Sequence, residues 1–445
     1  MDVPPLLPLV VEPIVAADTA WMLVASALVL LMTPGLAFFY GGLVRSKNAL
    51  NTMMMSFVAL GVVGVLWALA GYSLAFAAGS EWIGGAGHFG LRAVDLSAKG
   101  TIPHLLFLAY QGTFAIVTAA LISGAIVERM RFGAYVAFIG AWSLAVYAPV
   151  CHWVWGGGWF ADLGALDYAG GTVVHVNAGA AALVAAWVLG PRKDHGRQAL
   201  LPHNVPFVML GAALLWFGWF GFNGGSALAA NGGAVLAFVN TLLAPAAALV
   251  AWVAVDLLRT GRATAVGAVT GVVVGLVVIT PAAGFVGPGA AMAIGAVGIL
   301  PSYWLIVRRA RTRLDDSLDV AAAHGTGGLV GALLTGVFAN AAWGGVDGLL
   351  AGRPVQVVVQ LACALAVLAY SLGASWVLLR LIGLAIPLRA DRRAEGVGLD
   401  VIEHGEEAYG SEAGAILLLP DEGPSDRVRE ATRVRPIGSA VGDEA

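Results

Sequence analysis

The segment that decides the fold is residues 167–179, Asp167-Tyr-Ala-Gly-Gly-Thr-Val-Val-His175-Val-Asn-Ala-Gly. An aspartate and a histidine bracket a run of small residues, and the chain then continues apolar. A second histidine, His324, follows Asp319 in the same order at the start of another apolar segment. Because ionisable groups inside membrane-spanning segments are energetically expensive, each histidine is a candidate functional residue.

The composition is that of a polytopic membrane protein. Of the 445 residues, 59% are hydrophobic and only 11% are charged, whereas a soluble domain carries about 25% charged residues. This composition argues against extracellular enzymes and nucleic-acid-binding proteins, and the net charge of −3 indicates no particular partner. Both cysteines, Cys151 and Cys363, lie in apolar stretches, which favours buried thiols over a disulfide or a metal site.

About eleven apolar segments are long enough to cross a bilayer, for which about 20 residues are needed. An odd number of spans places the two termini on opposite sides of the membrane. The predicted spans are residues 19–42, 50–78, 103–127, 133–154, 171–190, 205–228, 233–258, 265–285, 288–307, 321–340 and 355–386.

The basic residues of the loops predict the orientation. In one set of loops the only basic residues are Arg92, Lys99 and Arg353. The other set contains most of the basic residues, and the positive-inside rule places it in the cytoplasm, with the N-terminus outside and the C-terminus inside. Its members are Arg45, Lys47, Arg129, Arg131, Arg192, Lys193, Arg197, Arg259, Arg262, Arg308, Arg309, Arg311 and Arg313.

The two histidines lie in spans of opposite direction. The span of His324 comes five spans after that of His175, and this odd offset predicts two five-helix halves of inverted topology followed by a last helix outside the repeat. At 1.5 Å per residue, each histidine lies only about 6–8 Å into its own helix, from opposite faces of the membrane. Spacing alone therefore does not bring the two rings into contact.

Several interpretations of these polar residues are open from the residues alone. A buried histidine is commonly satisfied by a structural hydrogen bond, but two histidines that each follow an aspartate favour a shared role with a polar solute or a proton. A metal site would need a third protein ligand, and none is evident nearby. Asp167 precedes a helix start, where it would cap the helix and also favour a cation at the outer side.

Aromatic residues gather at the outer ends of three predicted spans. Phe114, Trp155 and Ser226 place two π faces and a hydroxyl there, a combination that suits a small cation, although each residue taken singly also fits an interfacial position. Cation–π attraction reaches about 2 kcal/mol, whereas burying an isolated charge costs tens of kcal/mol in the Born limit. Such a cage can recruit a cation but cannot carry a bare one across.

At these residues the sequence resembles the ammonium transporter family, which comprises ammonium transporters, methylammonium permeases and Rh proteins, and it resembles the bacterial ammonium transporter branch in particular. The resemblance covers roughly residues 19–410. The matching motifs include Phe38-Phe-Tyr-Gly-Gly-Leu-Val-Arg-Ser-Lys-Asn48, Gln111-Gly-Thr-Phe114, Val154-Trp-Gly-Gly-Gly158, Asp167-Tyr-Ala-Gly-Gly-Thr-Val-Val-His-Val-Asn177, Gly218-Trp-Phe-Gly-Phe-Asn223 and His324-Gly325.

The resemblance implies an all-α protomer of eleven transmembrane helices with its own pore, assembled as a homotrimer in the cell inner membrane. It implies that ammonium or methylammonium is recruited at an outer site, that the cation is deprotonated and that ammonia is conducted, without enzymatic activity or a cofactor. The implied roles are substrate binding for Phe114, Trp155, Ser226 and Asp167, a gate formed by Phe114 and Phe222, and a pore lined by His175, His324 and Trp219. Tyr110 departs from the family, which often has Phe there, and is expected to change the polarity of the outer wall.

The chain is expected to have three parts. Residues 1–18 form an extracytoplasmic segment in which Val15-Ala16-Ala17 is a candidate cleavage site, 19–387 the transport domain, and 388–445 a cytoplasmic tail. The tail motif at 398–409 resembles that of members regulated by PII signal proteins, which makes such a protein a candidate partner. The rival hypothesis is an ammonium sensor that signals through this tail. An intramembrane hydrolase would need a nucleophile motif such as Gly-x-Ser-x-Gly.

Overall fold

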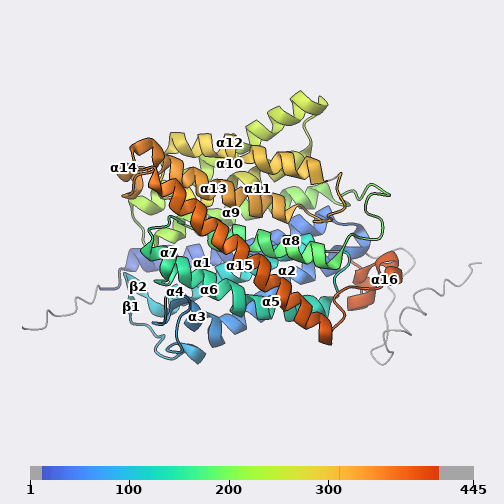
Figure 1. Ribbon diagram of the computed structural model, residues 1–445, viewed down its shortest axis with the longest axis horizontal. Coiled ribbons are helices and arrows are strands. Elements are labelled where there is room, and N and C mark those ends of the chain that lie inside the picture. Colours follow the sequence, from blue (N-terminus) through green and yellow to red (C-terminus); the bar gives the residue numbers. More distant parts are fainter. Residues whose placement is uncertain (1–12, 310, 410–445) are drawn as a thin grey trace, which may run out of the picture.

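The computed structural model describes residues 13–309 and 311–409, and within them eleven helical segments are long and apolar enough to cross a membrane, as predicted. Several spans change helix type along their length and therefore carry more than one label (Figure 1). The spans are Ala16–Leu43 (α1), Ser46–Phe76 (η1, α2, η2, α3), His104–Ala125 (α4, η4), Phe132–Asp162 (α5, η5, α6, α7), Gly171–Leu189 (η6, α8), Val205–Ala227 (α9, η7), Gly232–Thr260 (α10), Ala265–Ala282 (α11, η8), Pro288–Arg309 (α12), Ala321–Phe338 (η9, α13) and Val355–Ala385 (α15).

The composite spans divide as follows. Their pieces are η1 (Ser46–Asn48), α2 (Ala49–Leu66), η2 (Trp67–Gly71), α3 (Tyr72–Phe76), α4 (His104–Ile122), η4 (Ser123–Ala125), α5 (Phe132–Trp142), η5 (Ser143–Tyr147), α6 (Ala148–Trp155), α7 (Trp159–Asp162), η6 (Gly171–Val176), α8 (Asn177–Leu189), α9 (Val205–Gly224), η7 (Gly225–Ala227), α11 (Ala265–Ile279), η8 (Thr280–Ala282), η9 (Ala321–Thr326) and α13 (Gly327–Phe338).

The remaining elements lie between or after the spans. The fold is all-helical as expected, apart from a two-stranded antiparallel hairpin that contributes four residues between the second and third spans. We call the face of the bundle that carries this hairpin the hairpin face. The opposite face, where Arg45, Arg192 and Arg309 lie, we call the arginine-rich face. The elements are η3 (Phe89–Leu91), β1 (Ala98–Lys99), β2 (Ile102–Pro103), α14 (Ala341–Gly344), η10 (Leu349–Ala351), α16 (Arg392–Val397) and η11 (Asp400–His404).

Two observed boundaries differ from the predicted ones for local reasons. Helix α1 begins at Ala16, three residues before the predicted start of the transport domain, and residues 1–12 lie outside the described part of the chain. The fourth span was predicted to end at residue 154. Its last pieces instead run to Asp162, because the chain turns at Gly157, where φ is +85°, and α7 then resumes the helix.

The core forms where helices from distant parts of the chain approach closely. Helix α9 packs along α1, and at Gly211 a Cβ atom would overlap the backbone of Phe39, so this approach requires glycine. The long helix α15 contacts α5, α8 and α13 and lies diagonally across the bundle in Figure 1. The last span therefore packs against helices from both the first and the second half of the chain.

A second close approach joins the two segments that carry the histidines. η6 and α8 contact η9, and α13 contacts η6, so the two broken helices cross each other. At the crossing, a Cβ atom on Gly179 would overlap the Cα and N atoms of Gly325. The backbones of the two helices therefore meet with no side chain between them, which brings the residues just before the crossing together.

We expect Gly179→Ala to destabilise the protein, because the added methyl group would meet backbone atoms that cannot rotate away. Overpacking of this kind costs about 1–3 kcal/mol, and the thermal unfolding temperature in detergent measures the loss. Gly373→Ala is the matched control, because Gly373 also lies in a helix but a Cβ there meets nothing within 4 Å. An equal unfolding temperature for both variants would contradict the close approach.

Candidate functional site

The centre of the site is a pair of histidine rings in contact. The Nδ1 atoms of His175 and His324 are 3.2 Å apart, and both residues are almost completely buried. Nε2 of His175 has no hydrogen-bond partner among the described residues. Since the two Nδ1 atoms share one proton, one ring must present a bare Nε2 and the other an Nε2–H. The pair therefore always offers one acceptor and one donor beyond itself.

Each histidine follows the start of a helix, and an aspartate side chain caps that helix start. The carboxylate of Asp167 accepts hydrogen bonds from the backbone N–H groups of Gly170, Gly171, Thr172 and Val173 at 2.6–3.1 Å. The corresponding residue before His324 is Asp316, which accepts from the N–H groups of Val320 and Ala321. The spacing is the same in both cases, because His175 and His324 each lie eight residues after their aspartate.

The sequence comparison of Asp319 with Asp167 was therefore wrong in this detail. Asp319 does not cap the helix with its side chain. It adopts a left-handed backbone conformation, with φ +61°, and its carboxylate accepts a hydrogen bond from Arg309 Nε. The equal spacing of eight residues is the sequence feature that would have identified Asp316. Burial and the neighbouring carboxylate of Asp319 raise the pKa of Asp316 to about 6.

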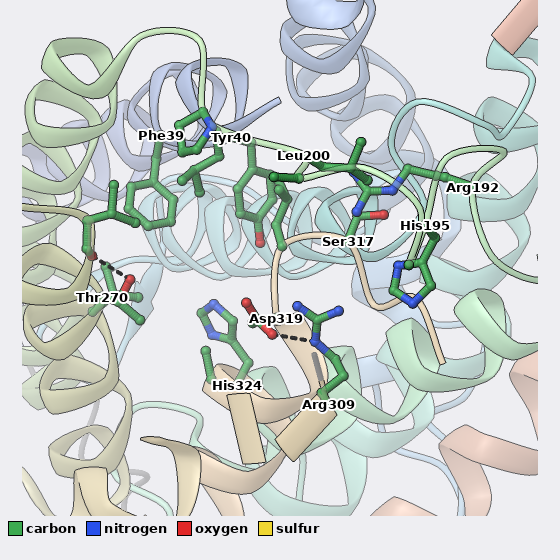
Figure 2. A pocket seen from close by; sticks show the side chains of 18 of the residues that line it. Phe39, Tyr40, Arg192, His195, Leu200, Thr270, Arg309, Ser317, Asp319 and His324 are labelled. Atoms are coloured by element: carbon green, nitrogen blue, oxygen red, sulfur yellow. Dashed lines mark hydrogen bonds and ion pairs between the residues drawn. The ribbon is translucent and has the colours of Figure 1, made fainter. Parts of the chain in front are cut away.

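A wide cavity opens on the arginine-rich side of the histidine pair. Its volume is about 440 Å³, and His324 and Asp319 lie along it. Figure 2 shows the ion pair between Arg309 and Asp319 beside the ring of His324, with Tyr40 across the cavity. On this side the approach to the histidines is therefore lined by charged and polar groups.

A small apolar cavity lies on the other side of the pair. Its volume is about 20 Å³, which is close to the space that one water-sized molecule needs. His175, His324, Trp219 and Phe222 line it together with aliphatic side chains. The His175 ring is stacked at 5.5 Å from the Trp219 ring and 6.1 Å from the Phe222 ring, and these two rings are 5.3 Å apart.

Two stacked phenylalanines separate this small cavity from the hairpin face. The rings of Phe114 and Phe222 are 4.2 Å apart with an interplanar angle of 24°. Phe222 lines the small cavity and Phe114 lines a third cavity of about 180 Å³. The two rings are almost fully buried, so they close the route between the two cavities in this conformation.

The third cavity, which we call the aromatic cavity, brings together the residues expected at the recruitment site. Phe114, Trp155 and Ser226 all line it. The Phe114 and Trp155 rings lie edge to face at 5.9 Å. The complete lining comprises Phe76, Phe107, Gln111, Phe114, Trp155, Tyr168, Ser226 and Leu228.

Asp167 does not line the aromatic cavity, but its backbone oxygen fixes Trp155, which does. The indole N–H of Trp155 donates a hydrogen bond of 2.8 Å to the backbone oxygen of Asp167. Burial raises the pKa of the Asp167 carboxyl, and its four backbone donors counteract that shift. The geometry thus agrees with the capping interpretation of Asp167 and connects this cap to the position of Trp155.

The sequence reasoning gave no role to Gln111, although it lies in the aromatic cavity. Gln111 is only 8% exposed, and its Oε1 atom has no hydrogen-bond partner among the described residues. Its signal in the sequence was its place one helical turn before Phe114 on the same helix. An unpaired amide oxygen in a cavity of aromatic rings is an available acceptor for a cation that carries N–H groups.

Tyr110 reaches the wall of this cavity through Ser226, which is one of the lining residues. Its hydroxyl lies 2.9 Å from the backbone oxygen of Phe222 and 3.2 Å from Ser226 Oγ, and Tyr110 is not among the lining residues. The Ser226 hydroxyl also donates to the Phe222 oxygen at 2.8 Å. Tyr110 therefore ties the end of α9, which carries Phe222, to Ser226.

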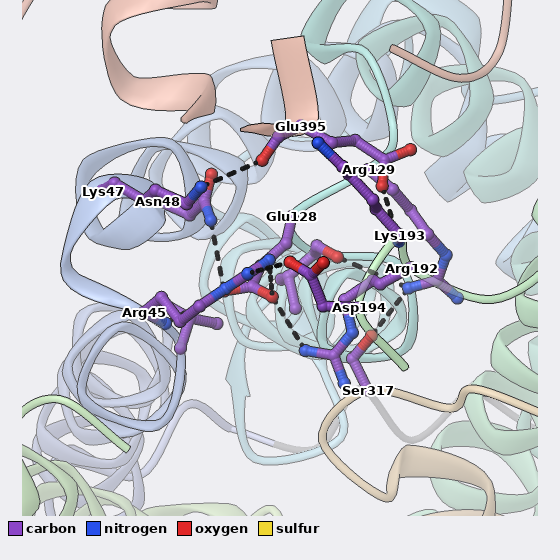
Figure 3. A network of polar contacts seen from close by, with 12 residues as sticks. Arg45, Lys47, Asn48, Glu128, Arg129, Arg192, Lys193, Asp194, Ser317 and Glu395 are labelled. Carbon is purple, nitrogen blue, oxygen red and sulfur yellow. Dashed lines mark hydrogen bonds and ion pairs between the residues drawn. The ribbon is translucent and has the colours of Figure 1, made fainter. Parts of the chain in front are cut away.

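The arginine-rich face holds a buried ionic network that the sequence did not reveal. Both carboxylate oxygens of Glu128 accept hydrogen bonds from Arg45, and one of them also accepts from Arg192 (Figure 3). Arg192 also forms a two-pronged pair with Asp315. Burial opposes ionisation of Glu128, but Arg192 and Arg45 outweigh it and lower its pKa. The network connects four loops of this face.

Residues 388–409 dock onto the same face. Lys47 Nζ donates to the backbone oxygens of Glu395 and Gly396, and Arg389 pairs with Glu395. The carboxylate of Asp400 accepts from the N–H groups of Leu50 and Asn51 at the start of α2. Burial raises the pKa of Asp400 to about 6. The described part of the tail is thus joined to the loops that hold the network.

The arrangement is a row of three cavities, with an aromatic cavity at one end and a hydrogen-bonding histidine pair between the other two. The described residues contain no group of three or more His, Cys, Asp or Glu side chains that could hold a metal ion. The route narrows between the two larger cavities to an apolar space for one small molecule. It suits a small solute that is a cation in water and can become neutral.

Known proteins share this architecture. The profile of the Ammonium Transporter Family matches residues 20–409. The ammonium transporter of Bacillus subtilis is 47% identical over 398 residues, which cover 88% of this chain and 98% of that protein. Ammonium transporter Amt1 of Archaeoglobus fulgidus is 44% identical over 393 residues, which cover 88% and 99% of the two chains.

Solved structures agree with these relatives. The crystal structure of Candida albicans Mep2 superimposes with a TM-score of 0.81 at 38% identity, covering 85% of this chain and 87% of Mep2. A structure named Sensor Amt Protein has a TM-score of 0.80 at 30% identity, covering 87% and 98% of the two chains. From its sequence and its fold, the chain belongs to the ammonium transporter family and is a multi-pass ammonium transporter of the cell membrane.

Proposed function

We propose that ammonium binds in the aromatic cavity, loses its proton near Phe114 and Phe222, and crosses as ammonia along His175 and His324. The observation that carries this proposal is the order of the three cavities, with the apolar space of about 20 Å³ between the stacked rings and the histidine pair. A space of that size has no room for a hydrated cation. The solute must therefore leave its water in the aromatic cavity.

The energies support deprotonation before the crossing. Phe114 and Trp155 attract a desolvated cation by about 2 kcal/mol, and the Gln111 and Ser226 oxygens add hydrogen-bond acceptors. Moving an isolated charge into a low-dielectric interior costs tens of kcal/mol in the Born limit. Loss of the proton removes that charge, so ammonia can pass where ammonium cannot.

The histidine pair can serve the neutral molecule in either arrangement of its shared proton. Ammonia donates through its N–H groups and accepts at its lone pair, and the pair offers one acceptor and one donor. A proton that moves from one histidine to the other would also cross the narrow part of the route. In our proposal this second path carries the proton removed from ammonium, which makes transport electrogenic.

We propose the orientation and the inverted repeat on two observations. The positive-inside rule places the arginine-rich face in the cytoplasm, so the aromatic cavity opens outside. The equal spacing of Asp167 to His175 and Asp316 to His324, each at a π-helical turn, supports two halves of opposite direction. Residues 19–387 then form the transport domain, and 388–445 the cytoplasmic tail.

The aromatic cavity is tested with Trp155→Leu in purified protein reconstituted into liposomes. We expect an ammonium pulse to drive a saturable current in the wild type, and we expect Trp155→Leu to raise the half-saturating concentration about tenfold, because about 1.4 kcal/mol of cation–π attraction is lost. Trp187→Leu is the matched control, since Trp187 is 67% exposed on α8. Equal half-saturation in both variants would exclude Trp155 from recruitment.

A second candidate function is ammonium sensing through the tail. The docking of residues 388–409 on the arginine-rich loops favours it, as does the similarity to the structure named Sensor Amt Protein. Truncation after Tyr409 leaves these contacts intact, whereas truncation after Pro387 removes them. Full uptake by the shorter chain would argue against a pure sensor, and binding without flux in the full chain would favour one.

Two partners follow from the resemblance and are proposals. A homotrimer would bury part of the apolar surface of the protomer, and native mass spectrometry of the protein in detergent tests it. A PII signal protein would bind the arginine-rich face, where the loops and residues 388–409 meet. Co-elution of a purified PII protein with the full chain, and its loss in the chain truncated after Pro387, would support that partner.

A further inference from the structure

Lys99 places an ammonium group in a second aromatic cage. Its Nζ atom lies 4.8 Å from the centre of the Phe107 ring and 5.8 Å from the centres of the Tyr72 and Phe76 rings. These distances are within the range of about 6 Å in which a cation is attracted to a ring face. In the part of the chain that the structure describes, Lys99 makes no ion pair and no hydrogen bond through its amine, so the three rings are its partners.

The backbone holds Lys99 in this place. Lys99 ends β1 and pairs with Ile102 of β2, and the turn between them has Gly100 at φ +61°. The hairpin leads directly into α4, with the N–H of His104 bonded to Ser97 O. Helix α4 also carries Phe107. The lysine and the nearest ring of its cage therefore belong to one short, hydrogen-bonded unit.

The cage of Lys99 and the aromatic cavity share two rings. Phe76 and Phe107 contact the Lys99 ammonium, and both also line the cavity with Phe114, Trp155 and Ser226. The Phe76 and Phe107 rings pack edge to face at 5.0 Å. A cation in the cavity is thus separated from a fixed cation of the same chemical type by aromatic rings that both contact.

We propose that Lys99 is a tethered primary ammonium that lowers the affinity of the aromatic cavity for ammonium. Two effects act in this direction. Like charges repel across a region of low dielectric, and rings that already interact with one cation have less attraction left for a second. Lys99 would then set the concentration range in which the transporter responds, and this role rests on the proposed function of the cavity as the recruitment site.

Burial lowers the pKa of the Lys99 amine. The unperturbed pKa of a lysine amine is about 10.4, which is well above neutral pH. The charged form is also the form that the three rings attract. The role proposed for Lys99 requires this charge, and the comparison of Lys99→Met with Lys99→Arg depends on it.

The test compares the half-saturating ammonium concentration for transport by Lys99→Met and by Lys99→Arg with that of the wild type. We expect Lys99→Met to lower it about two- to tenfold at low ionic strength, and Lys99→Arg to leave it near the wild-type value. Raising the ionic strength with sodium chloride should reduce the difference between Lys99→Met and the wild type, because salt screens partly exposed charges. Filling of space by the side chain would not produce this salt dependence.

Arg92→Met is the matched control. Arg92 is an exposed cation of the same loop, and among the described residues its side chain makes no cation–π contact with the three cage rings. We expect no change in this variant, and an equal shift in Arg92→Met and Lys99→Met would overturn the proposal in favour of a general surface charge. Lys99→Gln replaces Lys99→Met if the latter does not fold. An unchanged half-saturation in the uncharged variants would likewise overturn it.

Binding is measured beside transport, by the fluorescence of the tryptophans, one of which lines the aromatic cavity. If the wild type binds ammonium without flux or current, the proposed transport mechanism fails, and the binding constants still decide the role of Lys99. If the wild type transports normally and Lys99→Met binds ammonium with the wild-type constant, only the inference about Lys99 fails.

Discussion

His175→Ala is expected to abolish the ammonium-driven current of the reconstituted protein, with a loss of more than tenfold. The variant removes one half of the only hydrogen-bonding pair in the narrow part of the route within the described residues, where the adjoining cavity has a volume of about 20 Å³ and is otherwise aliphatic and aromatic. A proton that cannot be handed from one ring to the other must cross as a bare charge, which costs far more than the 1.4 kcal/mol that corresponds to tenfold.

The same experiment separates the charged path from the neutral one. Internal alkalinisation of the liposomes reports the entry of ammonia, and the current reports the entry of charge. We expect His175→Ala to lose the current, while any remaining alkalinisation would show that the enlarged apolar space still admits ammonia. A wild type that gives alkalinisation and no current would be a neutral channel.

Two conservative variants test the shared proton itself. His175→Asp and His324→Glu replace one ring by a carboxyl group, which can carry a proton but differs in reach and proton affinity. We expect each to reduce the current strongly. If both variants transported ammonium and passed current like the wild type, the proposed relay along the histidine pair would be wrong. Thermal unfolding of the same preparations shows whether the variants are folded.

The sequence predicted the spans well because a membrane span has a simple physical requirement. A bilayer needs about 20 apolar residues in a row, and each of the eleven segments satisfies it. The ends of the spans were harder to predict because glycines such as Gly157 let a helix turn and resume. The hairpin at residues 98–103 is too short to leave an alternating pattern in the sequence.

The contact between the histidines could not be predicted from the sequence, although each histidine was identified as a candidate functional residue. The number of residues between each histidine and the start of its helix places the two rings near opposite faces of the membrane, and therefore apart. In the structure the helix starts are π-helical and cross at Gly179 and Gly325, and cavities of about 440 and 180 Å³ extend from the two faces. The depth of a residue depends on this tertiary crossing, which spacing along one helix does not contain.

Charged residues of the loops were the least predictable part. Glu128 stands in a loop beside Arg129, where a solvated carboxylate is the usual expectation, yet its side chain is fully buried. Its partners Arg45 and Arg192 come from two other loops, and only the packing of the bundle brings them together. The positive-inside count placed these arginines on one face but could not show that some of them are paired there.

Asp167→Ala is expected to destabilise the protein by about 3 kcal/mol or more. The variant leaves four buried backbone N–H groups without an acceptor, and each unsatisfied buried donor costs about 1–3 kcal/mol before the site relaxes. The thermal unfolding temperature in detergent measures the loss. Asp162→Ala is the matched control, because this aspartate lies in the same stretch of chain and is exposed.

Asp167→Asn separates the cap from a direct role in binding the cation. An asparagine keeps one acceptor oxygen but turns an NH₂ group toward the remaining N–H donors, so we expect a loss of stability between that of the wild type and that of Asp167→Ala. Because the carboxylate oxygens are already bonded to the helix start and Asp167 is not in the lining of the aromatic cavity, ammonium binding should decline only as far as the helix start and the Trp155 wall are disturbed. A variant as stable as the wild type that no longer binds ammonium would instead make Asp167 a ligand of the cation.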